Sequence, residues 1–261
     1  MAWWNRRTSR NNATPRHRTR AQRLDALSAR NAEAATRLAD GDADEALRLL
    51  TSTVVACRAL LGDDHPDTLV VGGNLAVATA AAHRHREAID LLVTGVADRT
   101  RVLGGDDPRT LDAQDALATT YRLAGRPAEA VELAAVVADA RRRTLGPADA
   151  GTIAARTGLA LAQAADGKPV AAVGILESAL RDADFALGSR HLHTITVRAT
   201  LAGCHAVLGR VPDAVAGLER AVADCTELLG PDHPDTRALR ADLADVHSPQ
   251  GHSPQRLGLS A

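Results

Sequence analysis

The chain has 261 residues, enough for one or two ordinary domains with a large core. Hydrophobic residues make up 45% of it and aromatic residues only 2%, so Ala, Leu and Val must supply the core. Period-2 alternation of β-branched and aromatic residues is missing, which argues against a sheet and predicts an all-α fold. The net charge of -1 hides an asymmetry. Residues 1–24 hold seven Arg and no acid, so the rest of the chain carries a net charge of -8.

The cysteines and the hydropathy pattern predict a cytoplasmic protein. Cys57, Cys204 and Cys225 form an odd set without a CxxC pair, which suits buried thiols in a reducing compartment better than disulfides or metal ligands. No stretch approaches the roughly 18 consecutive apolar residues of a membrane span. The N-terminus also lacks the apolar region of a secretory signal.

Residues 1–19 are expected to form a basic, disordered tail. The Arg-rich stretch from Arg6 to Arg23 follows Trp3 and Trp4, and basic residues beside aromatic ones can bind nucleic acid or an anionic membrane surface. Two interpretations stay open, a solvated tail without a ligand and a phosphate-binding segment whose affinity falls steeply with salt.

A 42-residue repeat follows and runs without insertion or deletion. A Leu-Gly pair begins at residues 61, 103, 145, 187 and 229. The same step separates three further columns: Thr68, Thr110, Thr152, Thr194 and Thr236; Ala34, Ala76, Ala118, Ala160, Ala202 and Ala244; and Ala46, Ala88, Ala130, Ala172 and Ala214. Such regularity predicts a solenoid of identical structural units.

Each unit is predicted to be a pair of helices. The Leu-Gly pair ends one helix, because glycine adopts the left-handed conformation that closes a helix. Pro66 and its equivalents suit the first position of the next helix, and Asp107 and Asp149 stand where an N-cap belongs. In the second unit this predicts helices over residues 68–82 and 87–103. The two alanine columns would face each other and let the paired backbones approach closely.

Extended along the chain, the pattern predicts about eleven helices. The solenoid covers residues 20–247, in units of about 20–62, 63–104, 105–146, 147–188 and 189–230 and a capping helix over 231–247. Its terminal units are atypical, as in other solenoids. Residues 248–261 are expected to form a flexible C-terminal tail.

Three elements of the repeat resemble a known family. Asn74-Leu75-Ala76, Arg86-Glu87-Ala88 and the Leu-Gly-x-x-His-Pro-x-Thr link resemble tetratricopeptide repeats, in particular the 42-residue kinesin light chain type that bacteria (actinobacteria among them) also have. The resemblance implies a right-handed α-α superhelix whose first helices line a concave groove that binds a protein or peptide. Kinesin light chains use Asn residues on these helices. Here only Asn74 matches, and its equivalents are Ala116, Gly158, Thr200 and Asp242, so cargo binding of that kind is not implied.

Helix positions opposite the packing stripe predict the groove surface. They are small or mildly apolar with one acidic spot: Val70, Asn74 and Val77 in the second unit, Asp112, Asp115, Thr119 and Arg122 in the third, Thr157 and Leu161 in the fourth, and Thr196 and Thr200 in the fifth. We expect an amphipathic or extended peptide there, with Asp112 and Asp115 meeting a basic residue of the partner. The alternative is that both Asp are solvated helix-face charges.

A second column holds Arg156, Arg198 and Arg240. It predicts either a basic ladder for acidic ligands or stems packed over apolar neighbours with their heads in water.

Motifs of catalysis and metal binding are missing. The only lysine, Lys168, is followed by Pro169 and completes no P-loop. The His83-x-His85 and His191-x-His193 pairs have no Cys or acid at ligand spacing. The sequence therefore predicts a protein-interaction scaffold or adaptor without enzymatic activity, cofactor or metal. The alternative is a signal-responsive regulator that acts as a peptide receptor or contacts nucleic acid through its basic tail.

Overall fold

The structure, a computed structural model, describes residues 19–247, and this range holds eleven α-helices and no strand. The helices are α1 (Arg20–Ala39), α2 (Ala43–Leu61), α3 (Pro66–Ala81), α4 (His85–Leu103), α5 (Pro108–Leu123), α6 (Pro127–Leu145), α7 (Ala150–Ala165), α8 (Pro169–Ala186), α9 (Leu192–Val207), α10 (Val211–Leu229) and α11 (Pro234–His247). The all-α prediction and the number of helices are confirmed. The predicted tails lie outside the described residues except for Thr19, which caps α1 by accepting a hydrogen bond from the Gln22 amide.

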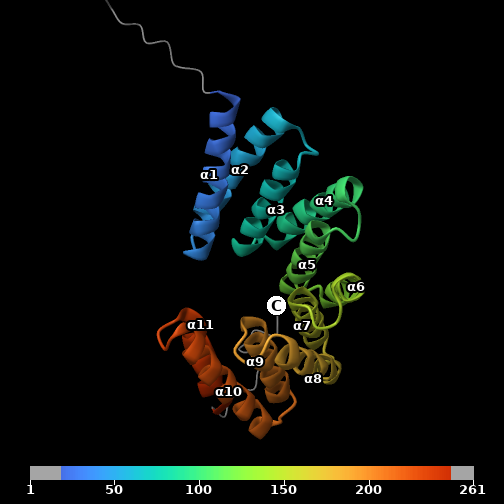
Figure 1. The fold of residues 1–261 in the computed structure, drawn as a ribbon, viewed down its shortest axis with the longest axis vertical. Coiled ribbons are helices and arrows are strands. Elements are labelled where there is room, and N and C mark those ends of the chain that lie inside the picture. The colour runs from blue at the N-terminus through green and yellow to red at the C-terminus, as the bar shows by residue number, and fades with distance from the viewer. Residues whose placement is uncertain (1–18, 248–261) are drawn as a thin grey trace, which may run out of the picture.

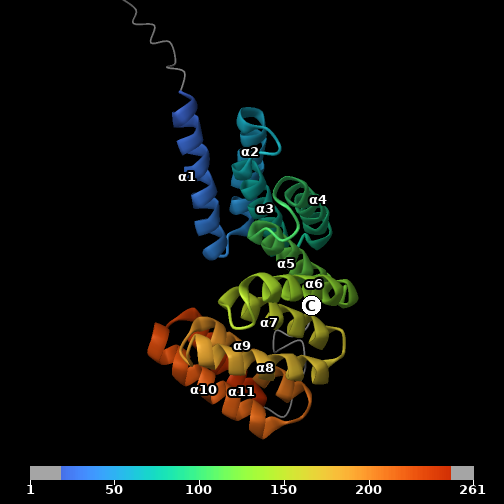
Figure 2. The same ribbon diagram turned by 45° about the vertical axis from the view of Figure 1, so that its right-hand side comes forward.

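Consecutive helices pack side by side into one elongated stack. Helices α3, α5, α7 and α9 follow one another along one side of it, and α4, α6 and α8 along the other (Figure 1). The N-terminal helices run roughly along the long axis, whereas those of the C-terminal half run across it (Figure 2). Successive pairs are therefore rotated, and the stack twists into a superhelix.

The links between units follow the predicted capping chemistry. Gly62, Gly104, Gly146 and Gly230 close their helices with φ between 90° and 97°. The next helix begins directly after an N-cap residue. At α5 this residue is Asp107, which accepts a hydrogen bond from the Arg109 amide at 2.9 Å. Helices α3 and α4 begin two residues earlier than the predicted 68 and 87, because Pro66 itself takes the first helical position of α3 and the turn before α4 is shorter than expected.

The alanine columns form the closest part of the core. The ten alanines that the two columns place in the first five units, from Ala34 to Ala214, are all buried. At Gly217 a Cβ would lie 2.9 Å from the Cβ of Ala202, so α9 and α10 leave no room for larger side chains at this crossing. Ala244 is exposed, because α11 has no second helix to cover it.

His83 occupies the turn position that glycine fills in the other units, and its φ is 58°. Left-handed backbone costs a non-glycine residue about 1–2 kcal/mol. We expect His83→Gly to relieve this cost and to raise the free energy of unfolding. The gain should be no more than about 1 kcal/mol, because the greater freedom of glycine in the unfolded chain offsets part of it. Urea unfolding followed by circular dichroism measures the change. Gly125→His is the matched control and should lose stability; two variants of equal stability would contradict the prediction.

Candidate functional site

A groove with two adjoining hollows lies between α3 and α5. The first hollow, of about 210 Å³, is lined by α3, α4 and α5. The second, of about 700 Å³, continues it toward the C-terminal ends of α3 and α5. Val77, Asp112 and Ala116 border both, so the hollows form one continuous surface.

The predicted residues of the second unit gather in the first hollow. Val70 and Val77 are 43% and 46% exposed, although valine is usually buried. Asn74 lies between them on α3, and its Nδ2 donates a hydrogen bond to Oδ1 of Asn31 on α1 at 2.8 Å. The second unit thus presents two apolar side chains around an amide that the first unit holds in place.

The predicted acidic spot of the third unit is neutralised from within. Asp112 accepts a hydrogen bond at 2.6 Å from Nη2 of Arg141, a buried residue of α6 that also donates to the Gly151 carbonyl. Asp115 lies partly buried beside the same guanidinium. Asp112 is therefore paired within the fold although its side chain is 71% exposed, and its contact with a basic residue of a partner stays a prediction. The sequence did not indicate this pairing, because α6 brings a cation to α5 at a position that the face of α5 alone does not reveal.

The titration of Asp115 gives a testable pH dependence. Burial raises the pKa of this carboxyl, the charge of Arg141 opposes the shift, and Asp112 adds to it. A raised pKa means that the folded state binds the proton more tightly, so this contribution to stability is present at low pH and is lost as the pH rises from about 3.9, the ordinary value, through the folded-state pKa. We expect Asp115→Asn to match the wild type in acid and to exceed it in melting temperature at neutral pH. A constant difference across that range would contradict this prediction. Asp139→Asn is the control with the opposite sign, because hydrogen bonding and charge from Arg142, and the charge of Arg143, lower the pKa of that exposed carboxyl.

The other two predicted groove residues of α5, Thr119 and Arg122, differ in their surroundings. Thr119 is exposed and lines the second hollow. Arg122 is partly buried, borders neither hollow, and has an Nη1 atom without a hydrogen-bond partner. Burial lowers the pKa of its guanidinium.

The predicted residues of the fourth and fifth units lie outside both hollows. Thr157 is buried and donates its hydroxyl to the Ile153 carbonyl at 2.9 Å, so its prediction as a surface residue is wrong. This face of α7 is covered by the neighbouring helices. Leu161 packs partly against the core, and the hydroxyls of Thr196 and Thr200 donate to carbonyls of their own helix.

The sequence prediction missed the groove residues that come from α4. Arg99 and Leu92 of α4 are part of the lining of the first hollow. Arg99 donates to the carbonyls of Leu69 at 2.5 Å and Gly95 at 3.1 Å. A signal was present in the repeat: the column is small in three units, with Cys57, Ala183 and Cys225, but holds Arg99 and Arg141 in the second and third.

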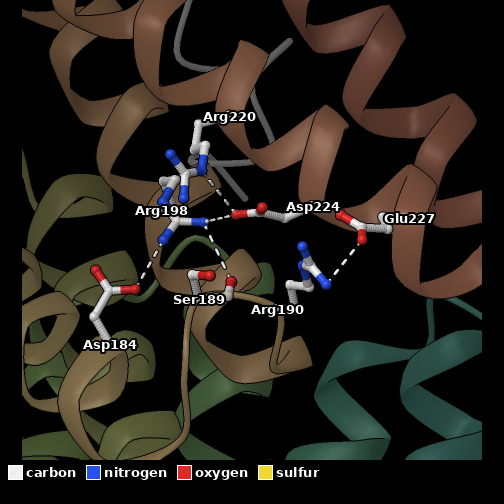
Figure 3. Close-up of polar contacts among 7 residues, drawn as sticks. All are labelled: Asp184, Ser189, Arg190, Arg198, Arg220, Asp224 and Glu227. Carbon is white, nitrogen blue, oxygen red and sulfur yellow. Dashed lines mark hydrogen bonds and ion pairs between the residues drawn. The ribbon is translucent and has the colours of Figure 1, made fainter.

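The Arg156, Arg198 and Arg240 column serves internal contacts. Arg156 donates to Asp182 at 2.6 Å, and Arg240 donates to the Pro231 carbonyl at 3.0 Å. Arg198 of α9 is buried, and its guanidinium lies between Asp184 of α8 and Asp224 of α10, at 2.9 and 2.6 Å (Figure 3).

The surroundings of Arg198 complete an ion-pair cluster. Arg220 also reaches Asp224, and Arg190 of the link pairs with Glu227 of α10 (Figure 3). Neither earlier interpretation holds for Arg156 and Arg198, whose heads face carboxylates of neighbouring helices, whereas Arg240 is exposed, as the second interpretation expects. Arg156 joins the two helices of its unit, and Arg198 joins α9 both to α10 of its own unit and to α8 of the preceding one.

The histidine pairs have local roles. His191 caps α9 by accepting a hydrogen bond from the His193 amide, and His83 and His85 meet edge to face. Among residues 19–247 no group of three or more His, Cys, Asp or Glu side chains is arranged to hold a metal ion. Within the same range no helix has both the length and the apolar character of a bilayer span.

Together, the helix pairs and the open groove define a protein-interaction scaffold of helical repeats, a class that is typically non-catalytic. The tetratricopeptide repeat family model matches residues 25–99, 74–143 and 185–255. The chain belongs to the tetratricopeptide repeat family, and its fold is the expected right-handed α-α superhelix.

Solved structures agree with this assignment. TPR-like repeats of a kinesin light chain from Podosopora anserina are 28% identical to this chain, cover 78% of it and 97% of their own length, and superpose with a TM-score of 0.66. A point variant of that protein gives 29% identity and a TM-score of 0.67, with coverage of 77% and 95%. BtubC from P. vanneervenii shares the fold at 20% identity, with a TM-score of 0.59 and coverage of 89% and 87%. No curated protein sequence matches the chain.

Proposed function

We propose that this protein is an adaptor that binds one segment of a partner protein in the groove between α3 and α5. The observation that carries the proposal is the pair Val70 and Val77, which stand exposed, two helical turns apart, on one groove wall. Apolar side chains at this spacing match the anchor residues of an amphipathic helix or alternate residues of an extended peptide.

The two hollows support the same proposal. Their shared border, which includes Asp112, lets a single segment fill both, with Thr119 and Arg141 in the second hollow. Because Asp112 is already paired, a basic residue of the partner would have to compete with Arg141. We therefore expect the apolar contacts to contribute more to affinity than the acidic residues. Leu161, Thr196 and Thr200 would be reached only by a longer partner segment.

Selection from a random displayed peptide library against the full chain tests the proposal. Binding of the enriched peptides is then measured by titration calorimetry against Val77→Glu and Val93→Glu. The second variant is the matched control, because Val93 is also 46% exposed but lies on α4 outside both hollows. A charge buried against an apolar peptide side chain should weaken binding by about tenfold or more.

The outcomes separate cleanly. Weaker binding to Val77→Glu with unchanged binding to Val93→Glu supports the groove. Equal effects of the two variants, or a library without groove-dependent peptides, would overturn it. We place this function in the cytoplasm, in keeping with the free, buried Cys57, Cys204 and Cys225. The basic segment proposed as a nucleic-acid contact lies mostly outside the described residues and stays a prediction.

A further inference from the structure

Exposed ion pairs join the links between units to the C-terminal ends of the second helices, at what we call the link edge of the stack. Each pair connects two residues that are 37 positions apart. The second, third and fifth units have such a pair: Arg101 with Asp64 at 2.5 Å, Arg143 with Asp106 at 3.8 Å, and Glu227 with Arg190 at 2.8 Å (Figure 3). The link edge is therefore charged in these three units.

The fourth unit interrupts this row. It has Ala148 and Phe185 at the two equivalent positions and so carries neither charge. Phe185 is the only phenylalanine of the chain, and it is 93% exposed in the last turn of α8. Phenylalanine is usually buried, because its removal from water is strongly favourable. An aromatic side chain that replaces a charge on the surface is typical of the core of an interface between proteins.

An apolar hollow lies on the same edge, between the link that joins α8 to α9 and the end of α10. Its volume is about 700 Å³. Leu187, Leu192 and Leu228 are part of its lining, and the last two are 48% and 44% exposed. Leu187 follows Phe185 by two residues, so the exposed ring and the hollow adjoin the same helix end.

This surface is complementary to a second copy of itself. A twofold axis would bring the exposed ring of each copy to the hollow of the other, as in the self-complementary interfaces of most homodimers. Charge also favours this occupant. Arg190 of the lining and Glu227 beside it contribute one charge of each sign, so the Glu227 of one copy can face the Arg190 of the other. The net charge of the whole chain is only -1, so two copies repel each other little.

We propose that two copies of this chain associate about a twofold axis through the link edge, with Phe185 of each copy seated in the leucine-lined hollow of the other. The inference goes beyond the proposed adaptor function, because none of these residues lines either hollow of the groove. A dimer of this kind presents two grooves and binds a partner that carries two copies of the recognised segment more tightly than a single chain does.

Sedimentation equilibrium of the full chain over a concentration series tests the proposal. We expect a reversible equilibrium between monomer and dimer. Phe185→Arg copies Arg101 and Arg143 of the neighbouring units and should weaken dimerisation by about 100-fold or more, because the twofold axis removes two rings from the interface at once. A wild-type chain that stays monomeric at every concentration, or a Phe185→Arg variant that dimerises as the wild type does, overturns the proposal.

Two further variants keep the result specific. Phe185→Arg/Ala148→Asp restores the ion pair of the other units, so it should melt as the wild type does and still be monomeric. Val170→Arg is the matched control, because Val170 is 66% exposed at the other end of α8 and Arg86 occupies its position in the second unit. It should dimerise as the wild type does. Equal losses for Val170→Arg and Phe185→Arg would overturn the assignment to the link edge.

An exchange of charges tests whether the ring enters the hollow. Leu228→Glu places a carboxylate in the hollow and should weaken dimerisation on its own. In an equal mixture with Phe185→Arg, the new arginine of one copy faces the new glutamate of the other, and the second ring and hollow keep their wild-type residues. We expect the mixture to associate at least about tenfold more tightly than either variant alone. A mixture that stays monomeric overturns the proposed contact.

The dimer and the groove can be tested separately. Val77→Glu, which should weaken peptide binding, lies away from the link edge and should dimerise as the wild type does. Loss of the dimer in this variant would contradict the proposed interface. Conversely, Phe185→Arg should still bind the peptides that the groove selects, so failure of the dimer would leave the proposed function standing.

Discussion

Replacing Asp224 with alanine is expected to lower the free energy of unfolding by about 3 kcal/mol, the lower end of the range for removing one partner of a buried ion pair. Asp224 and Arg198 are both buried, and the 2.6 Å bond between them joins α10 to α9. Asp184 still contacts the guanidinium in the variant, which keeps the loss from reaching the upper end of that range.

The chain itself contains the uncharged version of this pair. At the equivalent positions of the third unit it has Gln114 and Ala140. The double variant Arg198→Gln/Asp224→Ala should therefore fold. Its loss in the free energy of unfolding should be smaller than the sum of the two single-variant losses by about 1 kcal/mol or more. Urea unfolding of all four proteins measures this coupling. Losses that add within about 0.5 kcal/mol would show that the two residues act independently and would contradict the prediction.

Leu176→Ala is expected to cost about 2–5 kcal/mol, the range for removing a large side chain from a closed core. Leu176 is fully buried in the middle of α8, where it packs with Ile153, Val197 and other residues of α7 and α9. The small side chains Ala160 and Ala172 beside it are already at close approach, so the helices have little room to collapse into the cavity.

The measurement should also show that the damage is local. In a solenoid each unit contacts only its neighbours, so hydrogen exchange should lose most protection in α7, α8 and α9 and least in α1 and α2. Val170→Ala, on the exposed face of the same helix, should change stability by no more than about 0.5 kcal/mol. A loss below about 1 kcal/mol for Leu176→Ala, or a uniform loss of protection along the chain, would contradict the prediction.

Features that depend on residues close together in the sequence were predictable. The caps at Asp107 and Asp149 and the left-handed glycines between units require only a local turn, and the structure contains them. Helix α3 begins two residues before the predicted 68, at Pro66, which the sequence had already indicated as a suitable first helical residue.

The groove was predictable in part. Val70, Asn74 and Val77 come together on one face of α3, as helical spacing requires. Spacing within α5 could not show that Arg141 neutralises Asp112, nor could spacing within α7 show that neighbouring helices bury Thr157. Both depend on side chains that lie about 30 residues away or on other helices.

The sequence by itself determined the 42-residue unit, the eleven helices and the positions that pack or cap them, because periodicity and helix-ending residues act over a few residues. Only the tertiary structure decided which charges meet. The reach of Arg99 under Gly73 and the cluster around Arg198 depend on how far one helix is rotated and shifted against the next. That displacement results from packing along the whole superhelix, so the chemistry of the groove emerges from contacts between helices rather than from the repeat of any one of them.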